Sequence, residues 1–201
     1  MKYSNPTGLP SVSDIISPCE DQRWYKKEHT DRGNFVHGWA AADLLGLMTP
    51  PCPESYSPYI ASYLEFKQHI TDVHIVEKRL TSKRGYCGQI DLVGGLDSSY
   101  NYAIALLDWK TSQAAQKSWS ARLGGYTLLL EEHGIAINGA ASVRLKSKPT
   151  QSTGFYPLVN MMHRQEIKEA QIDFLSMYRV YQNILMDGKI YTTYTKNRED
   201  Y

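Results

Sequence analysis

Apolar and polar residues alternate along the middle of the chain in a way that predicts three consecutive β-strands. The segment 73–80 alternates weakly, and 86–93 follows it as a second strand. The segment 102–111 contains an unbroken apolar run at 102–107, which favours a strand at the centre of a sheet. Between the last two strands, 94–101 is rich in glycine, serine and aspartate, which favours a turn. These two strands are therefore predicted to form a hairpin.

Two helices are predicted before this group of strands. Thr30 or Asp31 can cap a helix that runs to about Leu45, and Gly46 is a suitable stop for it. A proline-rich loop follows, and a second helix is expected over about 59–70. Both helices are long enough to pack a face against a sheet.

The second half of the chain is predicted to alternate between helix and strand. Helices are expected at about 113–133 and 164–186, with strands at about 140–146 and 155–159 between them. One face of the first of these helices carries Trp119, Leu123, Tyr126 and Leu130. The inner stripe of the last helix comprises Ile167, Ala170, Phe174, Tyr178, Tyr181 and Leu185.

The N-terminal part is mixed, with an extended segment at 9–13 and a short helix that ends at 24–27. The complete order of elements is then ααβββαββα, which is an α/β fold with a central mixed β-sheet flanked by helices. The chain shows no internal repeat and no convincing boundary, and 201 residues can bury a real core. We therefore expect a single domain over 1–201.

The composition is that of a globular protein, with 42% hydrophobic and 21% charged residues. The formal net charge is only +1, so no general basic field marks a polyanion as the partner. Any nucleic-acid surface must be local. Two groups of basic residues are candidates for such a surface, and the alternative for each is a solvated face: Lys78–Arg79 with Lys83–Arg84, and Arg144 with Lys146 and Lys148.

The three cysteines, Cys19, Cys52 and Cys87, are widely spaced and form no CxxC pair. This pattern favours neither a disulfide framework nor a zinc site, and it fits a reducing compartment. The N-terminus lacks an apolar signal core and an arginine-rich transit pattern, and no apolar run is long enough to span a bilayer. We therefore expect a soluble cytoplasmic protein with no membrane partner.

Three charged residues on the predicted hairpin are the candidates for chemistry. Because strand side chains alternate, Asp108 and Lys110 point the same way, and the hairpin brings Asp91 beside Asp108. Desolvating such a group is costly. The grouping makes sense if a divalent metal binds between the carboxylates while the lysine handles a water or a phosphate oxygen. The alternative is a strand-end ion pair that faces solvent.

Two short motifs joined by the predicted hairpin carry a family pattern, Gly88-Gln89-Ile90-Asp91 and Asp108-Trp109-Lys110. Together they resemble the PD-(D/E)XK nuclease superfamily, and more narrowly its RecB-like and phage or mitochondrial exonuclease branch. The resemblance implies a restriction-endonuclease-like core with an αβββαβ order. It also implies three metal ligands: a histidine on an early helix, the aspartate of a Gly-x-x-Asp strand, and the acid of an (Asp/Glu)-x-Lys strand.

Other positions match this branch in part. His37 matches the helical histidine, although a packed core histidine is the alternative. Tyr126 matches the end of a Gln-x-x-x-Tyr motif on the next helix, but Arg122 stands where the glutamine is expected. The spacing puts both on one helix face, where an arginine can clamp a phosphate. Gly124–Gly125 between them indicates a close backbone approach, to the sheet or a DNA strand, or else close helix packing. The segment 10–13 also resembles the Pro-Ser-Val-Thr opening of phage members.

The resemblance implies a Mg²⁺- or Mn²⁺-dependent deoxyribonuclease, most simply an exonuclease, in DNA recombination or repair. One or two ions would bind Asp91, Asp108 and His37. Lys110 would position the attacking water, and Tyr126 would complete the catalytic group. The residues expected to bind DNA are Arg122, Tyr126, Lys78, Lys83 and Lys146. The cysteines do not reproduce the iron–sulfur set of some relatives, so we expect no iron–sulfur cluster. A phage origin, with a single-strand annealing protein as partner and the host cytoplasm as location, is implied in the same way.

Three points stay open. Glu77 is either a further acid near the site or an exposed strand residue paired with a lysine, and we favour the exposed position. The same fold can also serve a nucleic-acid-binding module that does not cleave, although the retained charges argue against it. A third function is hydrolysis of a small phosphoester. A closed pocket would favour that function, whereas an open groove lined by Lys78, Lys83 or Lys146 would oppose it.

Overall fold

A five-stranded mixed β-sheet lies at the centre of the protein, of which this computed structural model describes residues 7–20, 26–100, 102–149 and 154–186. The strands lie side by side in chain order. β3 and β4 are parallel, and the other neighbouring pairs are antiparallel. The strands are β1 (Ile70–Thr81), β2 (Cys87–Leu96), β3 (Ala105–Lys110), β4 (Gly139–Arg144) and β5 (Leu158–Met162).

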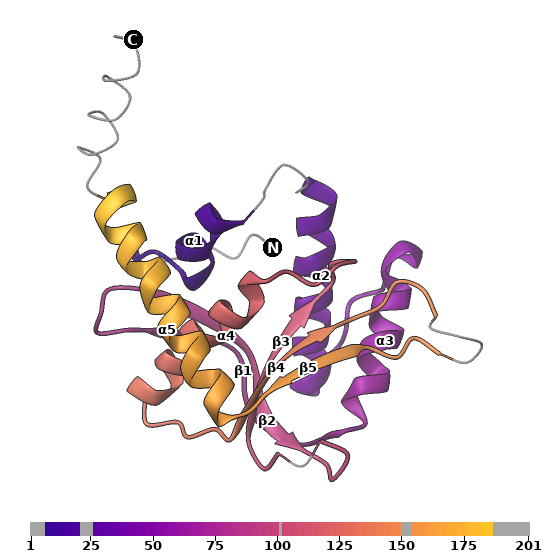
Figure 1. Cartoon of the computed structure of the whole chain (residues 1–201). Coiled ribbons are helices and arrows are strands. Elements are labelled where there is room, and N and C mark those ends of the chain that lie inside the picture. The colour runs from indigo at the N-terminus through magenta and orange to yellow at the C-terminus, as the bar shows by residue number, and fades with distance from the viewer. Residues whose placement is uncertain (1–6, 21–25, 101, 150–153, 187–201) are drawn as a thin grey trace.

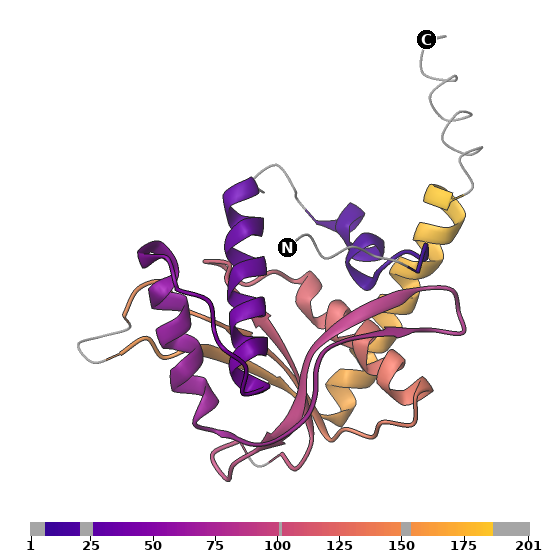
Figure 2. The same cartoon turned by 180° about the vertical axis from the view of Figure 1, so that it is seen from behind.

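Helices cover both faces of this sheet (Figure 1). On one face α2 (Lys27–Leu44) and α3 (Ser57–Lys67) share a buried cluster with the strands. On the other face α4 (Ser118–Glu132), α5 (Arg164–Val180) and the short α1 (Val12–Ile16) share a second cluster. Figure 2 shows the same three layers from behind. The expected α/β class with flanking helices is confirmed, and no helix of the described segments is long and apolar enough to cross a membrane.

The element order agrees with the expected one except for α1, which the sequence interpretation missed. The Ser11 hydroxyl accepts the Asp14 N–H at 3.1 Å, and the Asp14 carboxylate accepts the Ser11 N–H at 2.8 Å. Because this reciprocal cap stabilises a helical turn, the extended segment expected at 9–13 is wrong from residue 12 onward. The short helix expected to end at 24–27 falls largely outside the described residues.

Several predicted boundaries were wrong, among them the start of α4 at Ser118 and the position of β5 at Leu158–Met162, and two of the errors have identifiable reasons. The first long helix begins at Lys27, before the expected caps at Thr30 and Asp31, and no side chain caps it. The second strand continues past its expected end because Gly94 pairs with both Val73 and Ala105. The last helix is α-helical to Val180, and a single π-helical segment, η5 (Tyr181–Met186), follows it.

β3 shows how the alternation of a buried strand positions polar groups. Leu106 packs in the cluster under α4 and α5, whereas Leu107 and Trp109 pack in the cluster under α2 and α3. Asp108 and Lys110 therefore share the face of Leu106. The crossover from β3 to the parallel β4 runs through α4, so that helix covers the end of β3 that carries these charges.

Gly124 and Gly125 allow α4 and α5 to approach closely. A Cβ at Gly124 would lie 2.1 Å from the carbonyl oxygen of Ala170, and one at Gly125 would lie 2.8 Å from the ring of Phe174. Both contacts are shorter than van der Waals separation, so neither position accepts a side chain without movement of α5. Of the alternatives left open by the sequence, close helix packing is the one observed.

Gly124→Ala is expected to lower the free energy of unfolding by about 1–3 kcal/mol, because the added methyl would meet backbone atoms of α5. Gly33→Ala in α2 is the matched control, since a Cβ there meets only the Thr111 hydroxyl, at 3.7 Å. Removing that helical glycine should stabilise the protein by about 0.5–1 kcal/mol. Urea denaturation measures both changes. Equal midpoints for the two variants would contradict the close packing of α4 on α5.

Candidate metal centre

The two aspartates singled out in the sequence lie side by side where β2 and β3 separate. The antiparallel ladder pairs Leu92 with Leu107, and continuing that register by one residue places Asp91 opposite Asp108. Both side chains are nearly inaccessible, with 8% and 3% of their surface exposed. The predicted hairpin thus brings two carboxylates together in a buried position, and the charge of Asp91 acts on Asp108.

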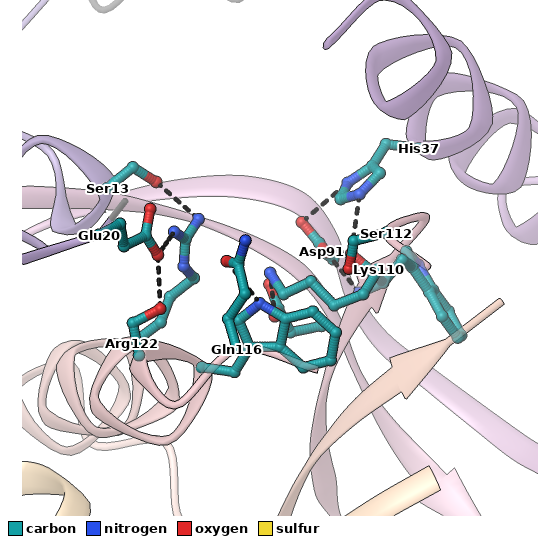
Figure 3. A network of polar contacts seen from close by, with 12 residues as sticks. Ser13, Glu20, His37, Asp91, Lys110, Ser112, Gln116 and Arg122 are labelled. Carbon is teal, nitrogen blue, oxygen red and sulfur yellow. Dashed lines mark hydrogen bonds and ion pairs between the residues drawn. The ribbon is translucent and has the colours of Figure 1, made fainter. Parts of the chain in front are cut away.

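The peptide groups of Trp109 fix the two neighbouring site residues. The Trp109 N–H donates to Asp91 Oδ2 at 2.8 Å, and the Trp109 carbonyl accepts a hydrogen bond from His37 Nε2 at 3.0 Å. A neutral His37 therefore keeps its proton on Nε2 and presents the lone pair of Nδ1 to the site. Nδ1 lies 3.3 Å from Asp91 Oδ1 and 3.7 Å from Glu77 Oε1. Figure 3 shows His37 reaching from α2 toward Asp91.

Glu77 belongs to this group, and the exposed position favoured from the sequence is wrong. Its side chain is 16% exposed, and its carboxylate accepts a hydrogen bond from Gln89 Nε2 at 2.6 Å instead of pairing with a lysine. The backbone of Glu77 has a φ of 45°, in the left-handed region. Holding a residue other than glycine there costs about 1–3 kcal/mol. Strand alternation cannot reveal a positive φ, so this orientation leaves no signal in the sequence.

One ligand atom from each of His37, Glu77 and Asp91 lies within 4.8 Å of the others. Two carboxylates and one imidazole suit a divalent cation such as Mn²⁺, and with added waters they suit Mg²⁺. Glu77 Oε1 is buried and accepts no hydrogen bond from the described part of the chain, so a bound cation would satisfy it. Asp108, expected as a ligand, lies next to this group but outside it.

Asp108 instead forms an ion pair with Lys110, within a largely buried site. Burial raises the pKa of Asp108, as does the charge of Asp91, while Lys110 opposes the rise. Burial likewise lowers the pKa of Lys110, and Asp108 opposes that change. The Lys110 ammonium also lies 5.9 Å from the centre of the Trp119 ring. The pair is thus an ammonium and a carboxylate in a setting where either can lose its charge more readily than in water.

Arg122 lies on α4 and contacts the N-terminal segment. Its guanidinium forms an ion pair with Glu20 at 3.2 Å and donates to the Ser13 hydroxyl at 3.2 Å, as Figure 3 shows. The Ser118 hydroxyl donates to the same Glu20 oxygen at 2.5 Å. The position expected to clamp a phosphate is therefore occupied by a carboxylate of the chain itself, and Glu20 is a contact that the sequence did not indicate.

Tyr126 is 7% exposed and packs one turn further along α4. A Cβ on Gly88 would lie 2.9 Å from its ring, so the glycine of the Gly-x-x-Asp motif provides the space for it. Burial raises the pKa of its hydroxyl, so this group keeps its proton at neutral pH. Because little of Tyr126 is accessible, its contribution to holding a strand is limited.

The three lysines expected to bind DNA do not gather on one surface. Lys78 is exposed on β1, and Lys83 lies in the β1–β2 turn, where its N–H donates to Glu132 at the end of α4. Lys146 follows β4 and, with Lys148, lines a cleft of about 240 Å³ beside α3. Tyr59, Ser112 and Gln113 also line this cleft, and no acidic side chain of the described residues does.

Comparisons with known proteins give distant structural likenesses only. No protein-family model matches the chain, and no curated protein matches it. One similar solved structure is LHK-Exo in complex with dAMP, at 11% identity and a TM-score of 0.42, covering 96% of this chain and 93% of that one. Another is a protein named putative exonuclease from Eubacterium rectale, at 11% identity and a TM-score of 0.46, covering 85% and 71%. Likenesses this distant do not say what this chain does.

Cation binding at this cluster is expected to release a proton. Burial lowers the pKa of His37, but Asp91 and Glu77 outweigh it and raise that pKa to about 10. Since Nδ1 can bind an ion only without its proton, the apparent Mg²⁺ affinity should rise about tenfold per pH unit between roughly pH 6.5 and 9. Isothermal titration calorimetry in buffers of different ionisation enthalpy counts the released protons. An affinity that does not change across this range would exclude His37 as a ligand.

Proposed function

We propose that the protein is a divalent-metal-dependent nuclease that hydrolyses phosphodiester bonds in DNA, in recombination or repair. The observation that carries this proposal is the position of the Asp108–Lys110 ion pair. The pair flanks Trp109, whose N–H donates to Asp91. It therefore lies next to the possible metal-ligand atoms of His37, Glu77 and Asp91. A cation site and a buried ammonium side by side suit a reaction at a phosphate, because charge accumulates on its oxygens during attack.

Each residue of the site would have a separate role in this reaction. Asp91 and His37 would hold one or two Mg²⁺ or Mn²⁺ ions, with Asp108 at the edge of the site. A bound cation supplies positive charge to a phosphate oxygen and makes a water more acidic. Lys110 would orient the attacking water or donate a hydrogen bond to a non-bridging oxygen. Asp108 fixes the direction of its ammonium group.

A module that binds without cleaving is the weaker alternative. Burying Asp108 and Lys110 carries a desolvation cost that their mutual attraction offsets only in part. A binding surface gains nothing from a charged pair with only 3% and 12% of its side chains exposed, because apolar residues of similar size fill the same space as stably. A reaction that uses the ammonium group accounts for that cost.

A strand of nucleic acid is favoured over a small phosphoester by the cleft that Lys146 and Lys148 line. It opens next to Ser112, two positions after Lys110, and the Leu145 N–H donates to the Lys110 carbonyl at 2.8 Å. The Lys110 side chain lies on the α4 side of the sheet and the cleft on the α3 side, so a polymer would reach both lysines by crossing the ends of β3 and β4. Neither lysine has an acidic partner within ion-pair distance among the described residues. A small substrate would make no use of them.

The function is tested directly with end-labelled linear and circular DNA, single- and double-stranded, in Mg²⁺ or Mn²⁺ and in EDTA. We expect cleavage of linear DNA only when metal is present. Ladders from either label also give the direction of degradation, and resistance of circular DNA would indicate an exonuclease. Cleavage that persists in EDTA, or no cleavage under any condition, would contradict the proposal.

Asp108→Ala is expected to reduce metal-dependent cleavage by at least about a thousandfold while the far-ultraviolet circular dichroism spectrum stays unchanged, since it removes the partner that orients Lys110. Lys110→Ala should have a similar effect on turnover. Because Lys110 is not among the donors of the cluster, that variant should still bind Mn²⁺ in calorimetry. Loss of Mn²⁺ binding in Lys110→Ala would instead give the lysine a structural role.

Replacing both Lys146 and Lys148 by glutamine is expected to weaken binding of a fluorescein-labelled oligothymidylate in EDTA. The slope of log affinity against log salt should fall by about 1.4 for two lost phosphate contacts on a single strand. Fluorescence anisotropy at several salt concentrations gives the slope. Lys168→Gln, an exposed lysine on α5, is the control. If both variants bind equally well, the cleft does not hold the strand.

A further inference from the structure

Glu77 lies in the regular part of β1, which runs from Ile75 to Thr81 after two register shifts nearer the start of the strand. On either side of it the β1–β2 ladder is intact, because Val76 pairs with Leu92 and Lys78 pairs with Ile90. This register places Glu77 opposite Asp91. The left-handed backbone conformation is therefore confined to one residue in the middle of a long strand, away from any turn.

In both strands, the alternation of side chains between the two faces of the sheet is broken at this point. In a regular strand, residues an odd number of positions apart lie on opposite faces. Ile75 and Leu80 nevertheless pack in the same cluster, under α4 and α5, and so do Ile90 and Val93 on the partner strand. The irregularity thus falls on the two acids that face His37. A regular pair of strands would not direct both carboxylates in this way.

The residue type at this position does not suit its backbone. Glycine, asparagine and aspartate adopt the left-handed conformation more readily than glutamate does. If the sheet needed only this break in the alternation of side chains, one of those residues would allow it with less strain. The presence of a glutamate indicates that its carboxylate has a use.

A hydrogen bond from Gln89 also fixes the orientation of the Glu77 carboxylate. Gln89 Nε2 donates to Glu77 Oε2 at 2.6 Å, while Gln89 Oε1 accepts from Arg79 at 2.8 Å. This chain of contacts leaves Oε1 directed to the site. There it lies 3.7 Å from His37 Nδ1, too far for a hydrogen bond, and it is buried. His37 is its ion-pair contact among the described residues, but the same imidazole also faces Asp91, so two buried carboxylates share one positive charge.

We propose that Glu77 is a ligand of the divalent cation and that Gln89 positions it. The strained backbone at residue 77 is then the means by which β1 supplies a carboxylate, opposite the one from β2. The ligand set differs from that implied by the two sequence motifs, because Glu77 takes the place beside His37 and Asp91 that was expected for Asp108. The inference rests on the proposed function only in requiring that a cation binds here.

Two substitutions separate the charge of Glu77 from its backbone strain. Asparagine and aspartate both tolerate the left-handed conformation and have nearly the same shape, and only aspartate keeps the carboxylate. In EDTA, both Glu77→Asn and Glu77→Asp should unfold at a higher temperature than the wild type, because each relieves strain. In calorimetry with MnCl₂, Glu77→Asn should bind at least about tenfold more weakly than Glu77→Asp.

Gln89→Leu tests the positioning role. Without the amide, the carboxylate of Glu77 is no longer fixed, and Mn²⁺ affinity is expected to fall by about tenfold. In the Glu77→Asn background the same change should have little further effect on Mn²⁺ affinity, because the ligand that it positions is gone. Asp72→Asn, an exposed acid on the same strand, is the control for a lost carboxylate and should leave Mn²⁺ affinity unchanged.

Equal Mn²⁺ affinity in the wild type and Glu77→Asn would overturn the inference, and so would a wild type that binds no Mn²⁺. The two proposals fail separately. If Glu77→Asn loses affinity but the wild type cleaves no DNA, Glu77 is a ligand in a protein that is not a nuclease. If Asp108→Ala abolishes metal-dependent cleavage while Glu77→Asn binds Mn²⁺ normally, the nuclease proposal stands and Glu77 is not a ligand.

Discussion

The rest of the site depends on two hydrogen bonds made by the backbone of Trp109. Its N–H holds Asp91 and its carbonyl holds His37, so one residue of β3 ties β2 and α2 together. The indole is 1% exposed and meets the rings of Tyr63 and Phe66 edge-on. Apolar packing on one face of the sheet thereby fixes the hydrogen bonds that orient two candidate metal ligands.

The charges at the site are compensated in pairs, with one acid left over. Lys110 faces Asp108, whereas His37 faces two acids, Asp91 at 3.3 Å and Glu77 at 3.7 Å. With all five groups ionised, three acids meet two cationic side chains, and the site is short of one positive charge. In a buried setting such an imbalance is unfavourable, and a divalent cation that displaces the proton of His37 corrects it.

Stability and site geometry oppose each other at two places. The left-handed backbone at Glu77 strains a strand whose ladder is regular on both sides of it, from Ile75 to Thr81. The buried Asp108–Lys110 pair gives up hydration for a contact that apolar residues could replace. The fold tolerates both because its two large clusters, and the close packing of α4 on α5 at Gly124, stabilise the sheet around them.

Sequence alone determined the features that depend on neighbours along the chain. Periodicity gave the sheet, the helices and the hairpin that sets Asp91 opposite Asp108, because strand and helix repeats are local properties. It did not reveal the direction of Glu77, since a single left-handed residue leaves no mark on an alternating pattern. Nor did it reveal the Glu20–Arg122 contact, which joins residues 102 positions apart. Only the packing of distant segments decides which carboxylate faces a cation and which faces an arginine, because burial and charge pairing are properties of the folded chain.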